Sequence, residues 1–175
     1  LDTVVNNLIV TNQLESMPSV RCRVMLTLPL ESFGIGRSII VSRGLVDVLP
    51  NEATLATILA HELAHLVLGH HKDNRYAFYE RLMIPDEDII KTLKFNRSSE
   101  EEAAADVKAF ELLKNSPYKD GLRSAGLFLR SMDEHARNLK RLFGSHLGDR
   151  LSTSTKRHLL MELKRGAPKL QHRNV

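Results

Sequence analysis

The chain has 175 residues, of which 42% are hydrophobic and 26% are charged, a composition that fits one globular domain with a sizeable core. Its one cysteine, Cys22, excludes an intramolecular disulfide framework and a thiolate-rich metal site. No apolar run approaches the roughly 18 residues that a membrane-spanning helix needs, and no signal peptide is recognisable. Because the chain begins with Leu1 rather than Met, we expect it to be the processed or excised soluble part of a longer protein.

The net charge of +4 is unevenly distributed along the chain. The part from Arg150 to Val175 holds seven Lys or Arg residues and one acidic residue, Glu162. A basic C-terminal region can bind an anionic membrane or nucleic acid. No aromatic residue is interleaved with these charges, so a solvated helix end and a basic tail over about residues 166–175 are the favoured interpretation. We expect no nucleic-acid partner, and peripheral membrane association stays open.

The first fifty residues are predicted to contain a helix, a hairpin and a short second helix. Residues 1–14 carry apolar residues at helical spacing, whereas residues 20–28 alternate apolar with mostly polar positions, as in a half-buried strand. Pro29 ends that strand, two glycines turn the chain, and residues 38–42 read as the return strand. Residues 43–49 should form a short helix that leads into the next element.

A helix over residues 51–71 is the central element of the prediction. Asn51 is a good N-cap, Glu52 places negative charge in the first turn, and Gly69 supplies a C-terminal stop. Leucines recur at helical spacing, and nearly every other position is apolar as well. The helix should therefore be buried on all sides.

Three further helices are predicted downstream, at residues 98–113, 121–142 and 155–164, by their apolar spacing. No structure is assigned to the aromatic-rich segment that follows His71 and breaks at Pro85. A small antiparallel sheet or hairpin packed on a mostly helical body predicts an α+β fold.

The central helix carries the sequence His61-Glu62-Leu63-Ala64-His65. Residues four apart on a helix lie about 40° from each other around the axis, so His61 and His65 can reach one metal ion. Glu62 points about 100° away from His61, where it can reach a metal-bound water. This H-E-x-x-H arrangement is typical of zinc peptidases. Two buried core histidines without a metal are the alternative interpretation.

Two histidines need a third ligand, and the residues leave two options. His71 is one, but Leu68 stands where a glycine would be needed to turn the chain back. Glu102 is the other, with Asp106 four residues later on the same helical face, where it can hydrogen-bond a ligating histidine. Glu102 could instead cap its helix with Ser99, although Ser98 and Glu101 form an equally good capping box.

The sequence HELAHLVLGHH, with EAAAD downstream, resembles the gluzincin peptidases that include the CAAX prenyl proteases, the HtpX-like membrane proteases and the OMA-like peptidases. The residues matching the H-E-x-x-H and E-x-x-x-D motifs are His61, Glu62, His65, Glu102 and Asp106, and the resemblance covers about residues 20–113. It implies that Asp106 supports His61. The transmembrane helices of the first two groups have no counterpart here, so the chain is more similar to the soluble, OMA-like members.

The motif and the resemblance together predict a zinc-dependent endopeptidase domain over residues 1–175, with one Zn²⁺ held by His61, His65 and Glu102. Zinc would lower the pKa of a bound water to about 7, and Glu62 would take its proton as the water attacks a peptide carbonyl. Peptides or unfolded proteins are the expected substrates. A bacterial periplasmic or other extracytoplasmic location is favoured.

Two other classes of function remain open. One is a catalytically silent, zinc-containing binding or chaperone-like domain, and the other is a membrane or nucleic-acid docking module that uses the basic tail. The residue that stabilises the oxyanion of a peptidase reaction is also open, and the candidates are Tyr76, Tyr79, His135, His146, Arg150 and His158.

Overall fold

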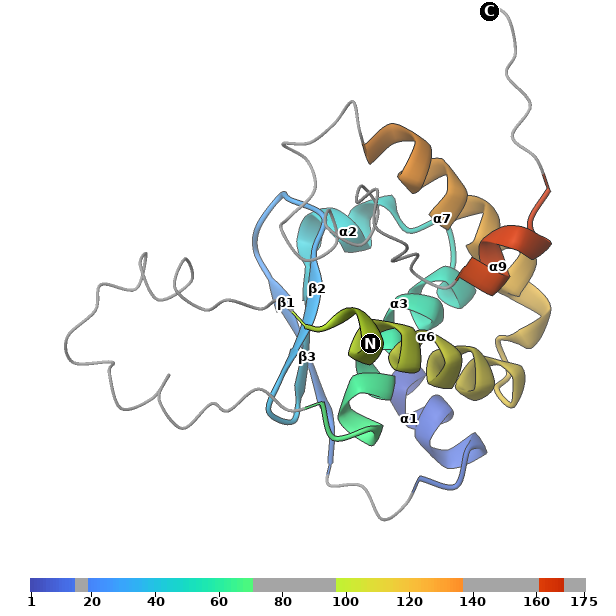
Figure 1. The fold of residues 1–175 in the computed structure, drawn as a ribbon. Coiled ribbons are helices and arrows are strands. Elements are labelled where there is room, and N and C mark those ends of the chain that lie inside the picture. The colour runs from blue at the N-terminus through green and yellow to red at the C-terminus, as the bar shows by residue number, and fades with distance from the viewer. Residues whose placement is uncertain (15–18, 71–96, 137–160, 169–175) are drawn as a thin grey trace, which may run out of the picture.

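A computed structural model describes residues 1–14, 19–70, 97–136 and 161–168 of the chain (Figure 1). Within them, a small sheet is surrounded by helices, which confirms the predicted α+β, mostly helical fold. The elements, in chain order, are α1 (Asp2–Thr11), β1 (Arg21–Met25), β2 (Ser32–Ile35), β3 (Ser38–Ser42), α2 (Arg43–Val48), α3 (Glu52–Val67), α6 (Ser99–Lys114), the 3₁₀ helix η2 (Lys119–Gly121), α7 (Leu122–Ala136) and α9 (Met161–Gly166).

The sheet is mixed, with the strand order β1-β3-β2. The predicted pairing of residues 20–28 with the return strand 38–42 as a hairpin is wrong, because β1 pairs with β3 in parallel, Arg21 opposite Ser38 and Met25 opposite Ser42. The hairpin is instead formed by β2 and β3, which pair antiparallel. This short strand β2 was not recognised in the sequence.

Local turn chemistry explains why β2 rather than β1 forms the hairpin with β3. Ile35 pairs with Ser38, so only Gly36 and Arg37 lie in the connecting loop. Gly36 has a φ of 56°, and a two-residue hairpin loop needs such a left-handed residue, which glycine adopts without strain. With β2 on one side of β3, only the other side remains for β1.

The predicted strand over residues 20–28 is also too long. β3 ends at Ser42, the N-cap of α2, so among the described residues no strand continues beside the chain beyond Met25. Leu26 and Leu28 are accordingly 83% and 76% exposed. The apolar alternation of this segment therefore does not report a buried face along its whole length.

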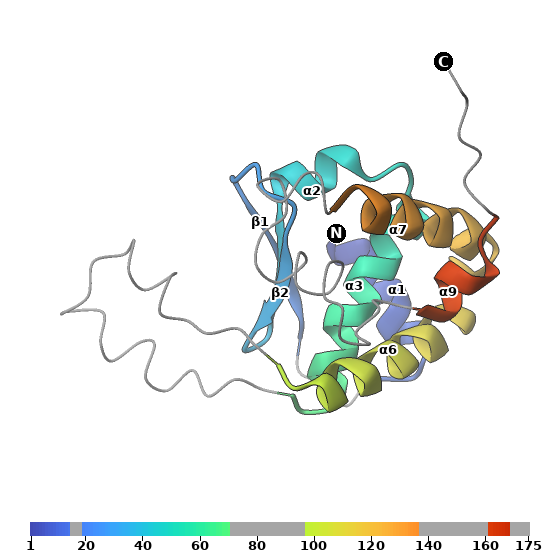
Figure 2. The same ribbon diagram turned by 45° about the horizontal axis from the view of Figure 1, so that its top comes forward.

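Helix α3 is the centre of the fold. Figure 2 shows it between the sheet on one side and α6 and α7 on the other, and α1 also packs against it. Positions 56–66 of α3 are buried without exception, among them Ile58, Leu59 and Leu63. The predicted burial on all sides is thus confirmed, and the polar residues of α3 lie in the core of the protein.

Both ends of α3 form as the sequence predicts. The Asn51 side chain accepts a hydrogen bond of 2.9 Å from the backbone N–H of Thr54. At the other end Gly69 has a φ of 70°, and the N–H of His70 donates to the carbonyl of His65 at 2.9 Å. This left-handed glycine reverses the chain and places His70 beside the last turn of α3.

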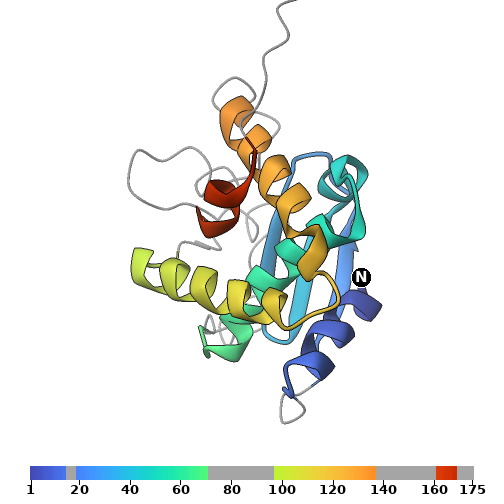
Figure 3. The same cartoon turned by 90° about the vertical axis from the view of Figure 1, so that its right-hand side faces the viewer.

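The remaining helices form an outer layer. Figure 3 shows α9 against α7. The helices predicted over residues 121–142 and 155–164 correspond to α7 and α9 in their described parts, whereas residues 137–160 lie outside the described residues. No helix among the described residues is long and apolar enough to span a membrane.

Candidate metal centre

The two histidines of α3 face each other in the core. The Nε2 atoms of His61 and His65 are 3.1 Å apart, and their side chains are 1% and 0% exposed. Their spacing of one helical turn brings them together, as the sequence predicts. Because α3 is buried on all sides, the pair is removed from solvent.

Helix α6 brings Glu102 to this pair. Its Oε2 lies 3.3 Å from His61 Nε2, and its Oε1 lies 3.6 Å from His65 Nε2. The capping box of α6 is formed by Ser98 and Glu101, through contacts of 2.9 and 3.2 Å. Glu102 is therefore not needed as a cap, and its carboxylate faces the histidines.

The spacing of these three side chains suits a tetrahedral metal ion. Zinc–ligand bonds of about 2.0–2.1 Å place neighbouring ligand atoms of a tetrahedron about 3.4 Å apart, close to the observed 3.1, 3.3 and 3.6 Å. One ligand atom from each residue lies within 4.8 Å of the others. His61, His65 and Glu102 could thus hold a zinc ion and leave one coordination position open.

Each histidine has a second contact at Nδ1. His61 Nδ1 lies 2.9 Å from Asp106 Oδ1, and His65 Nδ1 lies 3.1 Å from His70 Nδ1. A carboxylate oxygen is a hydrogen-bond acceptor, so Asp106 favours the tautomer of neutral His61 with its proton on Nδ1 and a lone pair on Nε2. Such outer partners orient metal-bound histidines. His70 was not recognised in the sequence, although its position directly after the helix-ending Gly69 was visible there.

Burial keeps His65 neutral at ordinary pH. Desolvation is the largest cause that lowers the pKa of His65 to about 4, and the charges of His61 and Arg97 lower it further, while Glu102 and Glu62 oppose the shift. Neutral imidazole is the form that binds zinc. A metal would therefore meet little competition from protons at this ring near pH 7.

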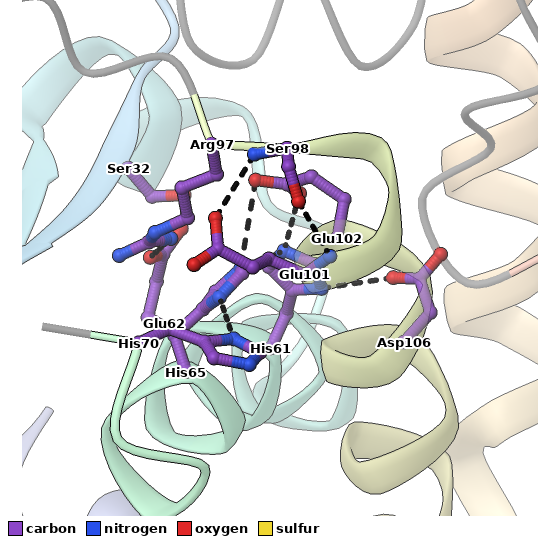
Figure 4. Close-up of polar contacts among 10 residues, drawn as sticks. All are labelled: Ser32, His61, Glu62, His65, His70, Arg97, Ser98, Glu101, Glu102 and Asp106. Carbon is purple, nitrogen blue, oxygen red and sulfur yellow. Dashed lines mark hydrogen bonds and ion pairs between the residues drawn. The ribbon is translucent and has the colours of Figure 1, made fainter.

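Glu62 lies beside the histidines, and both of its oxygens have partners. Ser32 of β2 donates a hydrogen bond of 3.0 Å to Oε1, and Arg97 Nη1 lies 3.4 Å from Oε2. Figure 4 shows Ser32 and Arg97 grouped with Glu62, with Asp106 on the opposite side of the histidines. Ser32 and Arg97 were not predicted from the sequence. They lie 30 and 35 residues from Glu62 in the chain, and no sequence pattern connects residues that far apart.

Most of the other candidate residues lie outside the described part of the chain. These are the alternative ligand His71 and the oxyanion candidates Tyr76, Tyr79, His146, Arg150 and His158. His135 is described, and it is exposed on α7 with Nδ1 2.7 Å from the carbonyl oxygen of Ser131 in the same helix.

A histidine pair and a glutamate that could hold a metal ion, with a second glutamate alongside, match the arrangement that is typical of H-E-x-x-H metallopeptidases. Residues 32–85 match the model of peptidase family M48, which supports a metallopeptidase of this family. The match covers the β2–β3 hairpin, α2 and α3, and it ends before Glu102. No curated protein matches the chain.

Proposed function

We propose that this chain is a zinc-dependent endopeptidase, with residues 1–175 forming one metallopeptidase domain of the OMA-like type. The observation that carries this proposal is the convergence of His61, His65 and Glu102 within ligand distance of one another, beside the buried carboxylate of Glu62. A cation between these atoms would compensate the charge of the Glu102 carboxylate and bind the lone pairs of both imidazoles.

In this proposal each residue of the site has one task. His61, His65 and Glu102 hold one Zn²⁺ per chain, and Asp106 orients His61. Bound zinc supplies a Lewis acid that polarises the peptide carbonyl and activates water at neutral pH. Glu62 takes a proton from the attacking water and passes it to the leaving nitrogen.

The substrate is proposed to be an extended peptide or an unfolded protein. β2 lies at an edge of the sheet, with β3 as its one partner strand among the described residues, and Ser32 connects it to Glu62. A peptide that adds to this edge would be bound through its main chain, with little selection for side chains. Cleavage at many sites in an unfolded protein is therefore expected.

The test is hydrolysis of casein by wild type and by Glu62→Gln, with the zinc content of each measured. The substitution keeps the size of the side chain and removes the base, so we expect wild-type zinc content and at least a 10²-fold loss of activity. Glu101→Gln, at the residue directly before Glu102, is the matched control and should keep both zinc and activity. Wild-type turnover by Glu62→Gln would remove Glu62 from the mechanism, and a zinc-loaded wild type without activity would favour a zinc-containing binding domain.

A further inference from the structure

Arg97 is a buried cation at the site that the proposed mechanism does not yet use. Its side chain is only 6% exposed, and Nη1 lies 3.4 Å from Glu62 Oε2. It directly precedes Ser98, the N-cap of α6, so the helix that supplies Glu102 also anchors Arg97. Figure 4 shows the guanidinium turned toward Glu62.

The same guanidinium lies against the edge strand β2. A Cβ added to Gly34 would be 3.5 Å from Arg97 Nη2 and 3.9 Å from Glu62 Oε2. The guanidinium thus lies within van der Waals range of the Gly34 position of β2. Arg97 therefore lies where the strand proposed to bind the peptide meets the proposed base.

Arg97 also has more N–H donors than its contact with Glu62 uses. A guanidinium has five N–H donors, yet within the described part of the chain the Nε of Arg97 is buried without a hydrogen-bond partner. A buried donor without a partner is costly. Nη2 of the same guanidinium faces the Gly34 position of the edge strand β2, so Arg97 holds a further donor on the side of the strand that is proposed to bind the peptide.

During hydrolysis, negative charge moves from Glu62 to the substrate, and the Arg97 guanidinium could stabilise it there. When the water attacks, one of its O–H bonds breaks and the proton goes to Glu62, which becomes neutral. The water oxygen bonds to the carbonyl carbon, and the electron pair of the C=O π bond moves to the carbonyl oxygen. Negative charge thus leaves the neighbour of Arg97 and appears on the substrate. The C–N bond then breaks as the nitrogen takes the proton from Glu62.

We propose that Arg97 is a catalytic residue that pairs with Glu62 in the resting site and stabilises the carbonyl oxygen of the scissile peptide bond as that oxygen becomes negative. This inference rests on the proposed peptidase function and extends it to a group that the sequence interpretation did not consider. Donors already in place where charge develops are among the strongest contributors to catalysis.

The competing explanation is that Arg97 only compensates the buried charge of Glu62. Removing Arg97 alone cannot separate the two roles, because it also leaves Glu62 buried without a counterion, and the protein could fail to fold. The comparison is therefore made in the Glu62→Gln background, where that charge is absent. Arg97→Met removes the cation and keeps the length of the side chain, and Arg97→Lys retains the charge.

The probe is a phosphinic peptide built on a site at which the wild-type protein cleaves casein, because its tetrahedral anionic group imitates the charged oxygen. Binding is measured for zinc-loaded Glu62→Gln, Glu62→Gln/Arg97→Met and Glu62→Gln/Arg97→Lys, and the zinc content of each is determined. The uncleaved peptide of the same sequence reports binding without the extra charge. Arg43→Met in the same background is the control, since Arg43 is exposed and pairs with Asp47.

We expect Arg97→Met to weaken binding of the phosphinic peptide about 10²-fold, Arg97→Lys to restore part of the loss, and the uncleaved peptide to bind equally to all variants. Equal binding of the phosphinic peptide with and without Arg97 would overturn the role of Arg97 and leave the proposed peptidase function intact. Absence of casein cleavage by the zinc-loaded wild type would overturn the proposed function and this inference together.

Discussion

Asp106 offers the sharpest test of the proposed zinc site, because it contacts a ligand without being one. Its Oδ1 lies 2.9 Å from His61 Nδ1, and its side chain is 20% exposed. In Asp106→Asn an acceptor oxygen remains and the negative charge is lost. In Asp106→Ala both are lost. The two variants therefore separate the orientation of the imidazole from the effect of the charge.

The contact sets the expected size of each effect. Loss of a partner behind a metal-bound histidine lowers metal affinity by about 10–100-fold. We expect Asp106→Asn to lie near tenfold, because its amide oxygen can still orient His61, and Asp106→Ala to approach a hundredfold. These factors correspond to about 1.4 and 2.7 kcal/mol of binding free energy. The metal-free protein should lose no more than about 1 kcal/mol of stability, the contribution of one hydrogen bond.

The assay is a competition titration of zinc against a chelator, with thermal melts of the metal-free proteins alongside. Glu111→Gln is the matched control, since Glu111 lies on the same helix, is 58% exposed and pairs with Lys108. It should leave the zinc affinity unchanged and alter stability by no more than about 0.5 kcal/mol. Equal zinc affinities for wild type and both Asp106 variants would refute the proposed support of His61.

Three further predictions concern the ligands, the pH dependence and the fold. Glu102→Gln should abolish stoichiometric zinc binding. Glu101→Gln keeps an acceptor for the capping box, so it should retain the metal and change stability by no more than about 0.5 kcal/mol. Equal zinc loss in both variants would contradict the assignment of Glu102. The pKa of His65 is lowered from 6.5 to about 4 in the folded protein, so the unfolded chain binds a proton at this histidine first as the pH falls. The metal-free protein should therefore lose roughly 2 kcal/mol of unfolding free energy between pH 7 and pH 5. Equal stability in urea denaturation at both pH values would exclude this shift. Gly44→Ala would place Cβ against the carbonyl oxygen of Leu28, closer than van der Waals contact allows, and should destabilise the protein by about 1–3 kcal/mol. A wild-type melting temperature would show that this close approach is not kept in solution.

The sequence alone was sufficient for the features that depend on neighbouring residues. The cap at Asn51 and the glycine that ends α3 were predicted, and both are present. The capping box of Ser98 and Glu101, one of two that the sequence offered, is the one that forms. The proximity of His61 and His65 follows from the helical repeat itself. These features involve residues at most a few positions apart, so their geometry is determined by local backbone conformation.

Only the tertiary structure decided which distant segments meet. The alternation around Val24 indicated a strand but not the direction of its pairing. β1 pairs in parallel with β3, on the side of β3 that the tight Gly36 loop leaves free of β2. The sequence offered two candidates for the third ligand, and the packing of α6 on α3 is what brings Glu102 to the histidines.

The surroundings of Glu62 show the physical reason most clearly. Ser32 and Arg97 come from a strand and a helix start that lie 30 and 35 residues away in the chain. A serine and an arginine at those positions have no periodicity or spacing that connects them with a glutamate on α3. Their contact arises because the hydrophobic faces of α3, α6 and the sheet pack together, and packing of this kind depends on the whole set of buried side chains rather than on any one segment.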